Sequence, residues 1–190
     1  MSLPTTNLSR PHRFYIAKRY FKGHSDAQSH PRKTENEPRD MTEEVEQKRP
    51  TLEGEAALRL WRQGPDAWNS WIDQHPGWNI SFEGVDFSTE RDPYGNLSFA
   101  DYHFGDGNVN FSNATFGKGD VRFFGAIFSG DNVDFSGTNF GDGNVIFYDT
   151  AFGHANMYFA GATFGTGNVY FSDAKFGNGD LYFYGTNFGD

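Results

Sequence analysis

The chain has 190 residues, no cysteine and a formal net charge of −9. Without cysteine, a disulfide framework and a thiolate metal site are excluded. Phenylalanine (21 residues) and glycine (23 residues) exceed ordinary usage, and this aromatic content argues against a wholly disordered chain. No apolar run reaches about 18 residues and no segment resembles a secretory signal. We therefore expect a cytoplasmic protein without a membrane span.

Acidic charge is concentrated in the second part of the chain. Residues 79–190 hold 14 acidic and 4 basic residues, a net charge of −10, whereas residues 1–78 hold 11 and 12. An acidic surface of this kind repels the nucleic-acid backbone. We therefore expect no direct nucleic-acid binding by residues 79–190.

Residues 1–50 are polar, rich in charge and interrupted by prolines, with no sustained hydrophobic period. This composition predicts a disordered, charged leader. Within it, residues 12–22 mix basic and aromatic side chains, a composition that also suits a short helix docking on a membrane surface, a nucleic acid or a partner protein. A solvated tail is the commoner behaviour of such a segment, and its role stays open.

Residues 51–78 predict a helical N-terminal cap made of two short helices. Thr51 can cap the first helix, Gly64 can end it, and Pro65 suits the first turn of the second. Apolar residues at helical spacing give each helix one face: Leu52, Ala56, Ala57, Leu60 and Trp61, then Ala67, Trp68, Trp71 and Ile72. The tryptophans could line a ligand site. Such a stripe is far more often core, and the region that follows needs an apolar cover at its first edge.

A polar insertion interrupts the pattern that begins at residue 79. After the strand-like pairs Ile80-x-Phe82 and Val85-x-Phe87, the step from Phe87 to the next phenylalanine of the series, Phe99, is longer than the usual seven positions by five. The extra residues lie within 88–96 and contain turn formers, which predicts a surface loop. Loops on a rigid scaffold often carry function, but without a chemical constellation a tolerated insertion is the favoured interpretation.

From residue 97 onward, phenylalanine recurs in two interleaved series, each at every twelfth position. The first series is Phe99, Phe111, Phe123, Phe135, Phe147, Phe159, Phe171 and Phe183, and the second is Phe104, Phe116, Phe128, Phe140, Phe152, Phe164, Phe176 and Phe188. Two positions before each phenylalanine stands an apolar or small residue. This alternation predicts very short strands with one buried face, and a period held over eight copies indicates a solenoid.

Four-residue corners rich in Gly, Asn and Asp join successive repeats, for example at residues 105–108 and 141–144. Glycine supplies positive φ, and Asn or Asp tolerates tight turn geometry. Because Asn or Asp ends each corner, stacked side chains are expected to hydrogen-bond in a ladder.

The short half of each repeat, such as FSNATF at 111–116 or FSGTNF at 135–140, resembles pentapeptide-repeat proteins, and residues 60–76 resemble the helical lead-in seen before such repeats. The resemblance covers about residues 58–190. It implies a right-handed quadrilateral β-helix in which the central Phe and the residue two before it point inward. This chain departs from the family pattern because one half of its repeat is longer than a pentapeptide by two positions.

The length of each coil follows from packing. A 12-residue coil has a perimeter of about 40 Å, which leaves little room for two phenylalanine rings in each layer. A 24-residue coil gives four faces and four rings per layer at native density, and we therefore expect this longer coil. The predicted fold is an all-β solenoid over 79–190, a right-handed quadrilateral β-helix preceded by two short capping α-helices and a disordered leader.

No catalytic, cofactor-binding or metal-binding constellation stands out, so we predict that the chain is not an enzyme. Gly- and Asp-rich corners bind Ca²⁺ in other β-helices, but here Asp106, Asp131 and Asp142 place carboxylates too irregularly, and turn chemistry explains them. His103 and His154 lack matching ligands, and no acid pair of the glycosidase kind is singled out. The outward position before the second Phe is not a threonine array, which excludes an ice-binding surface.

Outward positions next to the first phenylalanine series become aromatic toward the C-terminal end. They give a candidate partner surface: Phe124, Ile146, Tyr148, Tyr158, Tyr170, Tyr182 and Tyr184. With four faces per coil, Tyr158, Tyr182 and Tyr184 fall on one side and the other four on the opposite side. These side chains could form a protein-binding patch, or could stack across strands and stabilise the sheet alone.

These features favour a non-enzymatic structural or protein-interaction scaffold that presents acidic and aromatic solenoid faces to an unknown protein partner. The resemblance implies an alternative, because some pentapeptide-repeat proteins are acidic rods that mimic DNA in the channel of a type II topoisomerase. A supercoiling assay with gyrase separates the two hypotheses. The sequence also stops in mid-corner, which predicts an uncapped last coil and an end-to-end homodimer through it.

Overall fold

A computed structural model describes residues 48–189. The predicted leader at 1–50, with the basic and aromatic segment 12–22, therefore lies outside the described residues except for its last three positions. Within the described range the chain forms ten short β-strands and two α-helices. Strand β1 (Thr51–Glu53) comes first, helices α1 (Gly54–Trp61) and α2 (Pro65–Gln74) follow it, and the remaining strands come after the helices.

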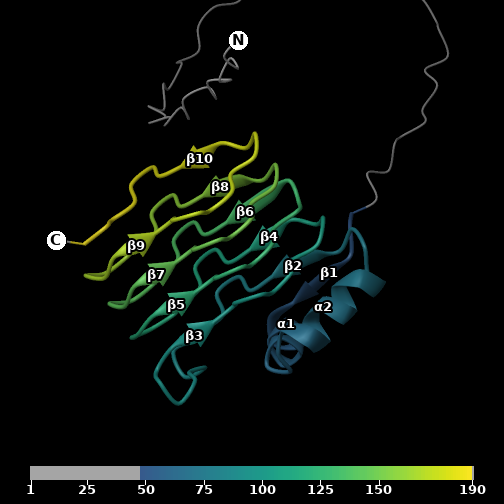
Figure 1. Ribbon diagram of the computed structural model, residues 1–190, viewed down its shortest axis with the longest axis horizontal. Helices are drawn as coiled ribbons and strands as arrows, with labels where there is room; N and C mark the ends of the chain where they lie inside the picture. The colour runs from purple at the N-terminus through teal and green to yellow at the C-terminus, as the bar shows by residue number, and fades with distance from the viewer. Residues whose placement is uncertain (1–47, 190) are drawn as a thin grey trace, which may run out of the picture. The chain divides into compact units, whose positions relative to one another are not determined.

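The strands form two parallel sheets, which Figure 1 shows as two rows of arrows along the repeat region. One sheet has the order β1-β2-β4-β6-β8-β10, with β2 at Asn79–Ser81, β4 at Val109–Asn110, β6 at Asn132–Asp134, β8 at Asn156–Tyr158 and β10 at Leu181–Tyr182. The other has the order β3-β5-β7-β9, with β3 at Leu97–Ser98, β5 at Val121–Arg122, β7 at Val145–Ile146 and β9 at Val169–Tyr170.

Both sheets keep one register from coil to coil. Leu97 pairs with Val121 in one sheet and Val109 with Val133 in the other, and Asn132 bonds to Asn108, 24 residues earlier. Two further columns of parallel bridges lie between the sheets: His103, Ile127, Ala151 and Lys175, and Thr115, Asn139, Thr163 and Asn187. The longer of the two coil lengths considered from the sequence is therefore confirmed. Stacked parallel strands at this regular spacing fit a solenoid repeat protein.

The insertion leaves this pairing intact. Across it the step rises from 24 to 29 residues, as between Asn79 and Asn108, while Asp86 still pairs with Thr115. The extra residues form turns and bends between Ser88 and Leu97, with Pro93, Tyr94 and Gly95 exposed. The predicted surface loop is confirmed.

The phenylalanines form the core, as the period predicts. Both series are almost fully buried from Phe99 to Phe164, and rings one coil apart stack face to face. The centroids of Phe99 and Phe123 lie 4.9 Å apart, and those of Phe104 and Phe128 lie 4.5 Å apart. This distance matches the spacing of neighbouring strands, so each ring covers the next as the strands pair. Burial declines at the last coil, where Phe188 is 52% exposed.

Polar ladders stabilise the corners. Asn132 Nδ2 donates to Asn108 Oδ1 at 3.2 Å, and Asn144 Nδ2 donates to Asp120 Oδ1 at 3.1 Å in a second column. The ladder expected from the corner pattern is therefore confirmed.

Each repeat contains a second tight turn, outside the four-residue corners, that the corner pattern does not predict. Between the strand and the bridge residue of each unit, the chain takes positive φ at every twelfth position. The members are Asp101, Asn113, Gly125, Gly137, Asp149, Gly161, Asp173 and Gly185. Only Gly, Asn and Asp occupy this column, which are the residues that tolerate left-handed backbone.

The expected role of Thr51 as a helix cap is wrong. Thr51 belongs to β1, which extends the first sheet by pairing with β2, and the Asn79 N–H donates to the Pro50 carbonyl. Helix α1 therefore starts at Gly54, after Glu53, whose side chain makes no capping hydrogen bond. Of the expected apolar face of this helix, Ala57 and Trp61 are buried, but Ala56 is exposed and Leu58 is buried in addition.

Candidate functional site

Four of the outward apolar residues gather on the sheet β3-β5-β7-β9. Ile146 pairs in register with Tyr170, and the rings of Phe124 and Tyr148 stack with centroids 5.4 Å apart. Phe124, Tyr148 and Tyr170 are 42%, 41% and 43% exposed. We call Phe124, Ile146, Tyr148 and Tyr170 the aromatic face.

Tyr158 and Tyr182 lie on the other sheet, and Tyr184 follows its last strand. Tyr158 and Tyr182 stack with centroids 4.9 Å apart and an interplanar angle of 3°, and both are partly buried. The Tyr158 hydroxyl donates to Asn132, and Tyr184 is exposed beyond β10. The structure thus places the seven residues in two separate groups, as four faces per coil predict.

Charged residues next to the aromatic face are paired with each other. Lys175 Nζ lies 3.1 Å from Asp149 Oδ1, and Arg122 lies 3.7 Å from Asp120. Asp149 follows Tyr148 directly in the chain. The aromatic face therefore has a rim of mixed charge in a region whose net charge is negative.

The tryptophans divide into different roles. Trp68 is fully buried and stacks on Phe82, and its indole N–H donates to the His103 carbonyl. Trp71 is partly buried, against His75 and Trp78. The core interpretation is confirmed for Trp68 and for Trp61, which packs against Phe87 and Phe99. Trp61 also lines a pocket.

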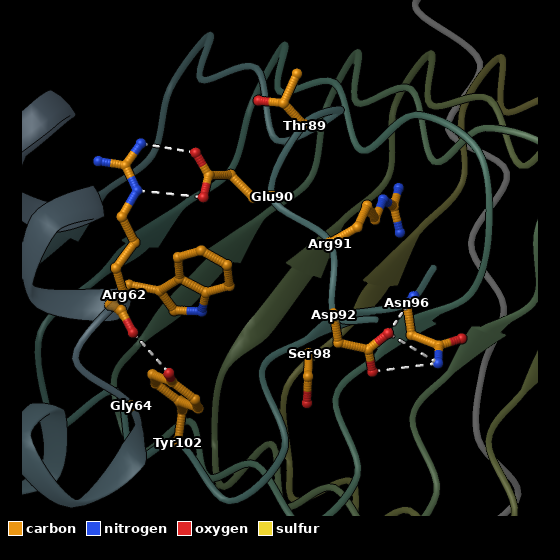
Figure 2. Close-up of a pocket in the computed structure, with 10 residues that line it drawn as sticks. Arg62, Gly64, Thr89, Glu90, Arg91, Asp92, Asn96, Ser98 and Tyr102 are labelled. Carbon is orange, nitrogen blue, oxygen red and sulfur yellow. Dashed lines mark hydrogen bonds and ion pairs between the residues drawn. The ribbon is translucent and has the colours of Figure 1, made fainter. Parts of the chain in front are cut away.

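This pocket, of about 310 Å³, lies between the end of α1 and the inserted loop (Figure 2). Its lining comes from Trp61, Arg62, Gly64, Thr89, Glu90, Arg91, Asp92, Asn96, Ser98 and Tyr102. Arg62 joins the two walls, because its Nη2 lies 2.6 Å from Glu90 Oε1 and its Nε donates to Glu90 Oε2. These bonds lower the pKa of Glu90 and raise that of Arg62.

The inserted loop supplies the opposite wall. Asp92 accepts hydrogen bonds from the backbone N–H groups of Tyr94 and Asn96, and the Asn96 bond is the main reason that the pKa of Asp92 is lowered. Arg91 reaches down to the next coil and donates to the carbonyls of Phe116 and Asp120. Burial lowers the pKa of Arg91.

Tyr102 closes the floor of the pocket. Its hydroxyl donates to the Trp61 carbonyl at 2.8 Å, and burial raises its pKa to about 12. In the later coils the equivalent inward position holds only Ala or Thr. Two sequence features therefore mark the pocket: Tyr102 at a position where later repeats have Ala or Thr, and the insertion within residues 88–96. Neither feature alone predicts a pocket.

The described part of the chain holds no group of three or more His, Cys, Asp or Glu residues placed to share a metal ion. Neither of its helices has the length and apolar character that crossing a membrane requires. Comparison of the chain with models of known protein families, with curated proteins and with solved structures found no match.

Proposed function

We propose that this chain is a non-enzymatic protein-interaction scaffold of the pentapeptide-repeat type, folded as a right-handed quadrilateral β-helix. Four columns of parallel pairing, each repeating every 24 residues, support four faces per coil. Right-handed winding is the expected hand, because parallel strands joined by crossovers are almost always connected that way. The FSNATF-like segments support the family assignment through their inward Phe and Ala.

The aromatic face is the observation that carries the functional proposal. It places three exposed aromatic rings and Ile146 on neighbouring rungs of one sheet. Contiguous exposed apolar groups of this kind mark interaction surfaces, and aromatic residues dominate the energetics of such surfaces. The strands beneath are rigid, so binding would cost little ordering of the face.

Ring stacking that only stabilises the sheet explains the aromatic face less well than partner binding does. On the opposite sheet, Tyr158 and Tyr182 also stack, yet those two residues are partly buried and their hydroxyls are hydrogen-bonded to Asn132 and Asp180. The rings of Phe124, Tyr148 and Tyr170 remain above 40% exposed. The partner we propose is a protein with apolar anchor residues and a basic rim, because residues 79–190 carry a net charge of −10.

Affinity capture from the native cell tests this function, with the full chain and two variants as bait. The first variant changes the aromatic face (Phe124→Ser, Tyr148→Ser, Tyr170→Ser), and the matched control changes the other side (Tyr158→Ser, Tyr184→Ser). A protein retained by the wild type and the control but lost by the first variant, and then bound as a purified protein at least about tenfold more weakly by that variant, supports the proposal.

Equal capture by both variants would contradict it. If the protein instead inhibited supercoiling by gyrase, and did so equally after the aromatic-face substitutions, DNA mimicry would replace the scaffold function.

The last described coil supports a second copy of this chain as an additional partner. Phe171, Phe183 and Phe188 border a hollow of about 550 Å³ together with Val169. Two such apolar ends can cover one another in a symmetric contact. Sedimentation of the full chain should show a dimer that Phe188→Ser weakens, whereas a monomeric mass at all concentrations would exclude this contact.

A further inference from the structure

Two buried side-chain nitrogens in the described residues have no hydrogen-bond partner, Trp61 Nε1 and Arg91 Nε. Both residues line the pocket between α1 and the inserted loop. Each of these atoms is an N–H donor, so what both lack is an acceptor. Native proteins rarely leave buried donors unpaired, and an unpaired pair in one pocket indicates a missing group.

The charges of the pocket point to the nature of that group. The Glu90 carboxylate is already bound to Arg62, and the Asp92 carboxylate is bound to backbone N–H groups. Arg91, which is partly buried, donates hydrogen bonds only to the carbonyls of Phe116 and Asp120. The carboxylates of Asp92 and Asp120 act on its charge, but none of the ion pairs among residues 48–189 includes it. A partly buried guanidinium that forms no ion pair, and whose charge burial disfavours, favours a bound anion.

We propose that this pocket binds a small molecule through an oxyanion, a carboxylate or a phosphate, which accepts hydrogen bonds from Trp61 Nε1 and Arg91 Nε. Guanidinium groups bind both oxyanions through charge-assisted hydrogen bonds. The volume of about 310 Å³ is that of a small-ligand site. An anion beside Arg91 would also offset the burial that lowers its pKa.

Binding requires a small rearrangement, because neither nitrogen is exposed to solvent. Arg91 lies on the surface loop, so its side chain can swing from the carbonyls of Phe116 and Asp120 toward a ligand. Glu90, the residue before Arg91, lies 2.6 Å from Arg62 and fixes this part of the loop beside α1. The insertion therefore supplies both the binding cation and the residue that fixes the loop.

Nuclear magnetic resonance of the uniformly ¹⁵N-labelled full chain tests the proposal, with inorganic phosphate and acetate as probes at constant ionic strength. The chain has four tryptophans, and Trp61→Phe identifies the Trp61 indole signal by its loss. One of the two probes should shift this signal and the Arg91 Nε signal in a saturable way. The Trp68 indole signal should stay in place, since that N–H already donates to His103.

Two variants separate a specific site from general attraction. Arg91→Ala should weaken binding about tenfold or more, through loss of a charge-assisted hydrogen bond. The control Lys175→Ala removes an exposed cation that is paired with Asp149, away from the pocket lining, and should leave the affinity unchanged. The fingerprint spectrum of each variant shows whether it remains folded.

Saturation by phosphate alone assigns a phosphate ligand, and saturation by acetate alone assigns a carboxylate ligand. Shifts that rise linearly with both salts, or an equal loss of affinity in both variants, would overturn the proposal. So would unchanged binding in Trp61→Phe, which keeps an aromatic ring against Phe87 and Phe99 but lacks the N–H.

Discussion

Trp68 donates its indole N–H to the carbonyl oxygen of His103 at 2.8 Å and thereby fixes helix α2 to the first coil. Asn69 adds two bonds beside it, from Nδ2 to the Asp101 carbonyl and from the His103 N–H to Oδ1. The Asn69 side-chain amide thus replaces a neighbouring strand, because it hydrogen-bonds to backbone groups at the edge of the coil. The helices are therefore a polar as well as an apolar cover.

Trp68→Phe should destabilise the protein more than Trp61→Phe does. Both substitutions remove similar ring volume from buried sites, but only Trp68 gives up a hydrogen bond and leaves the His103 carbonyl without this donor. The expected difference in the free energy of unfolding is about 1–3 kcal/mol, measured by urea unfolding. Equal losses would show that the bond to His103 does not stabilise the cap.

Truncation to alanine should lower the free energy of unfolding much more at a core phenylalanine than at a surface phenylalanine. Phe135 is fully buried between Phe111 and Phe159, so Phe135→Ala should cost about 3–5 kcal/mol through lost burial and the cavity that remains. Phe124→Ala removes only an exposed ring stacked on Tyr148 and should cost below about 1.5 kcal/mol. Similar unfolding midpoints for the two variants would contradict this assignment of inside and outside.

Two glycines of the repeat should respond differently to a side chain. A Cβ at Gly143 would overlap the backbone of Gly119 in the neighbouring coil, so Gly143→Ala should force the coils apart and lower the unfolding temperature. Gly161 has positive φ and open space around it, and its column already contains Asp149 and Asp173. Gly161→Asp should therefore be close to neutral. Thermal unfolding followed by circular dichroism compares them.

The bond between Arg62 and Glu90 should make stability depend on pH in the acidic range. Its hydrogen bond lowers the pKa of Glu90 from the ordinary value of 4.5, so the folded state holds the carboxylate charged more strongly than the unfolded state does. This contribution is fully present above pH 4.5 and is lost as the pH falls through the lowered value. Glu90→Gln should therefore flatten the fall in unfolding free energy below pH 4.5.

Urea unfolding at a series of pH values and low salt measures this slope. Glu53→Gln is the matched control, because Glu53 is exposed at the end of β1. Equal changes of slope in both variants would show that the loss of any carboxylate, and not of the pair with Arg62, is responsible.

The repeat itself determined the inward set, the stacking of phenylalanines and the corner ladders. A local alternation such as Val121-x-Phe123 fixes which side chains face inward, and a constant period brings identical positions into register, so Phe123 falls on Phe147. Ring size then selected the longer coil, with two repeat units in each layer. These properties depend on spacing along the chain, which the sequence displays directly.

Only the tertiary structure decided which segments cover the first coil and where the pocket lies. Thr51 has the chemistry of a helix cap, yet pairing of Leu52 with Ile80 makes its segment a strand. Trp61 is the core residue that its spacing predicts, but it also lines a pocket with the inserted loop, and its N–H has no acceptor. Both outcomes depend on contacts between segments that lie outside the repeat, where no period predicts which groups meet.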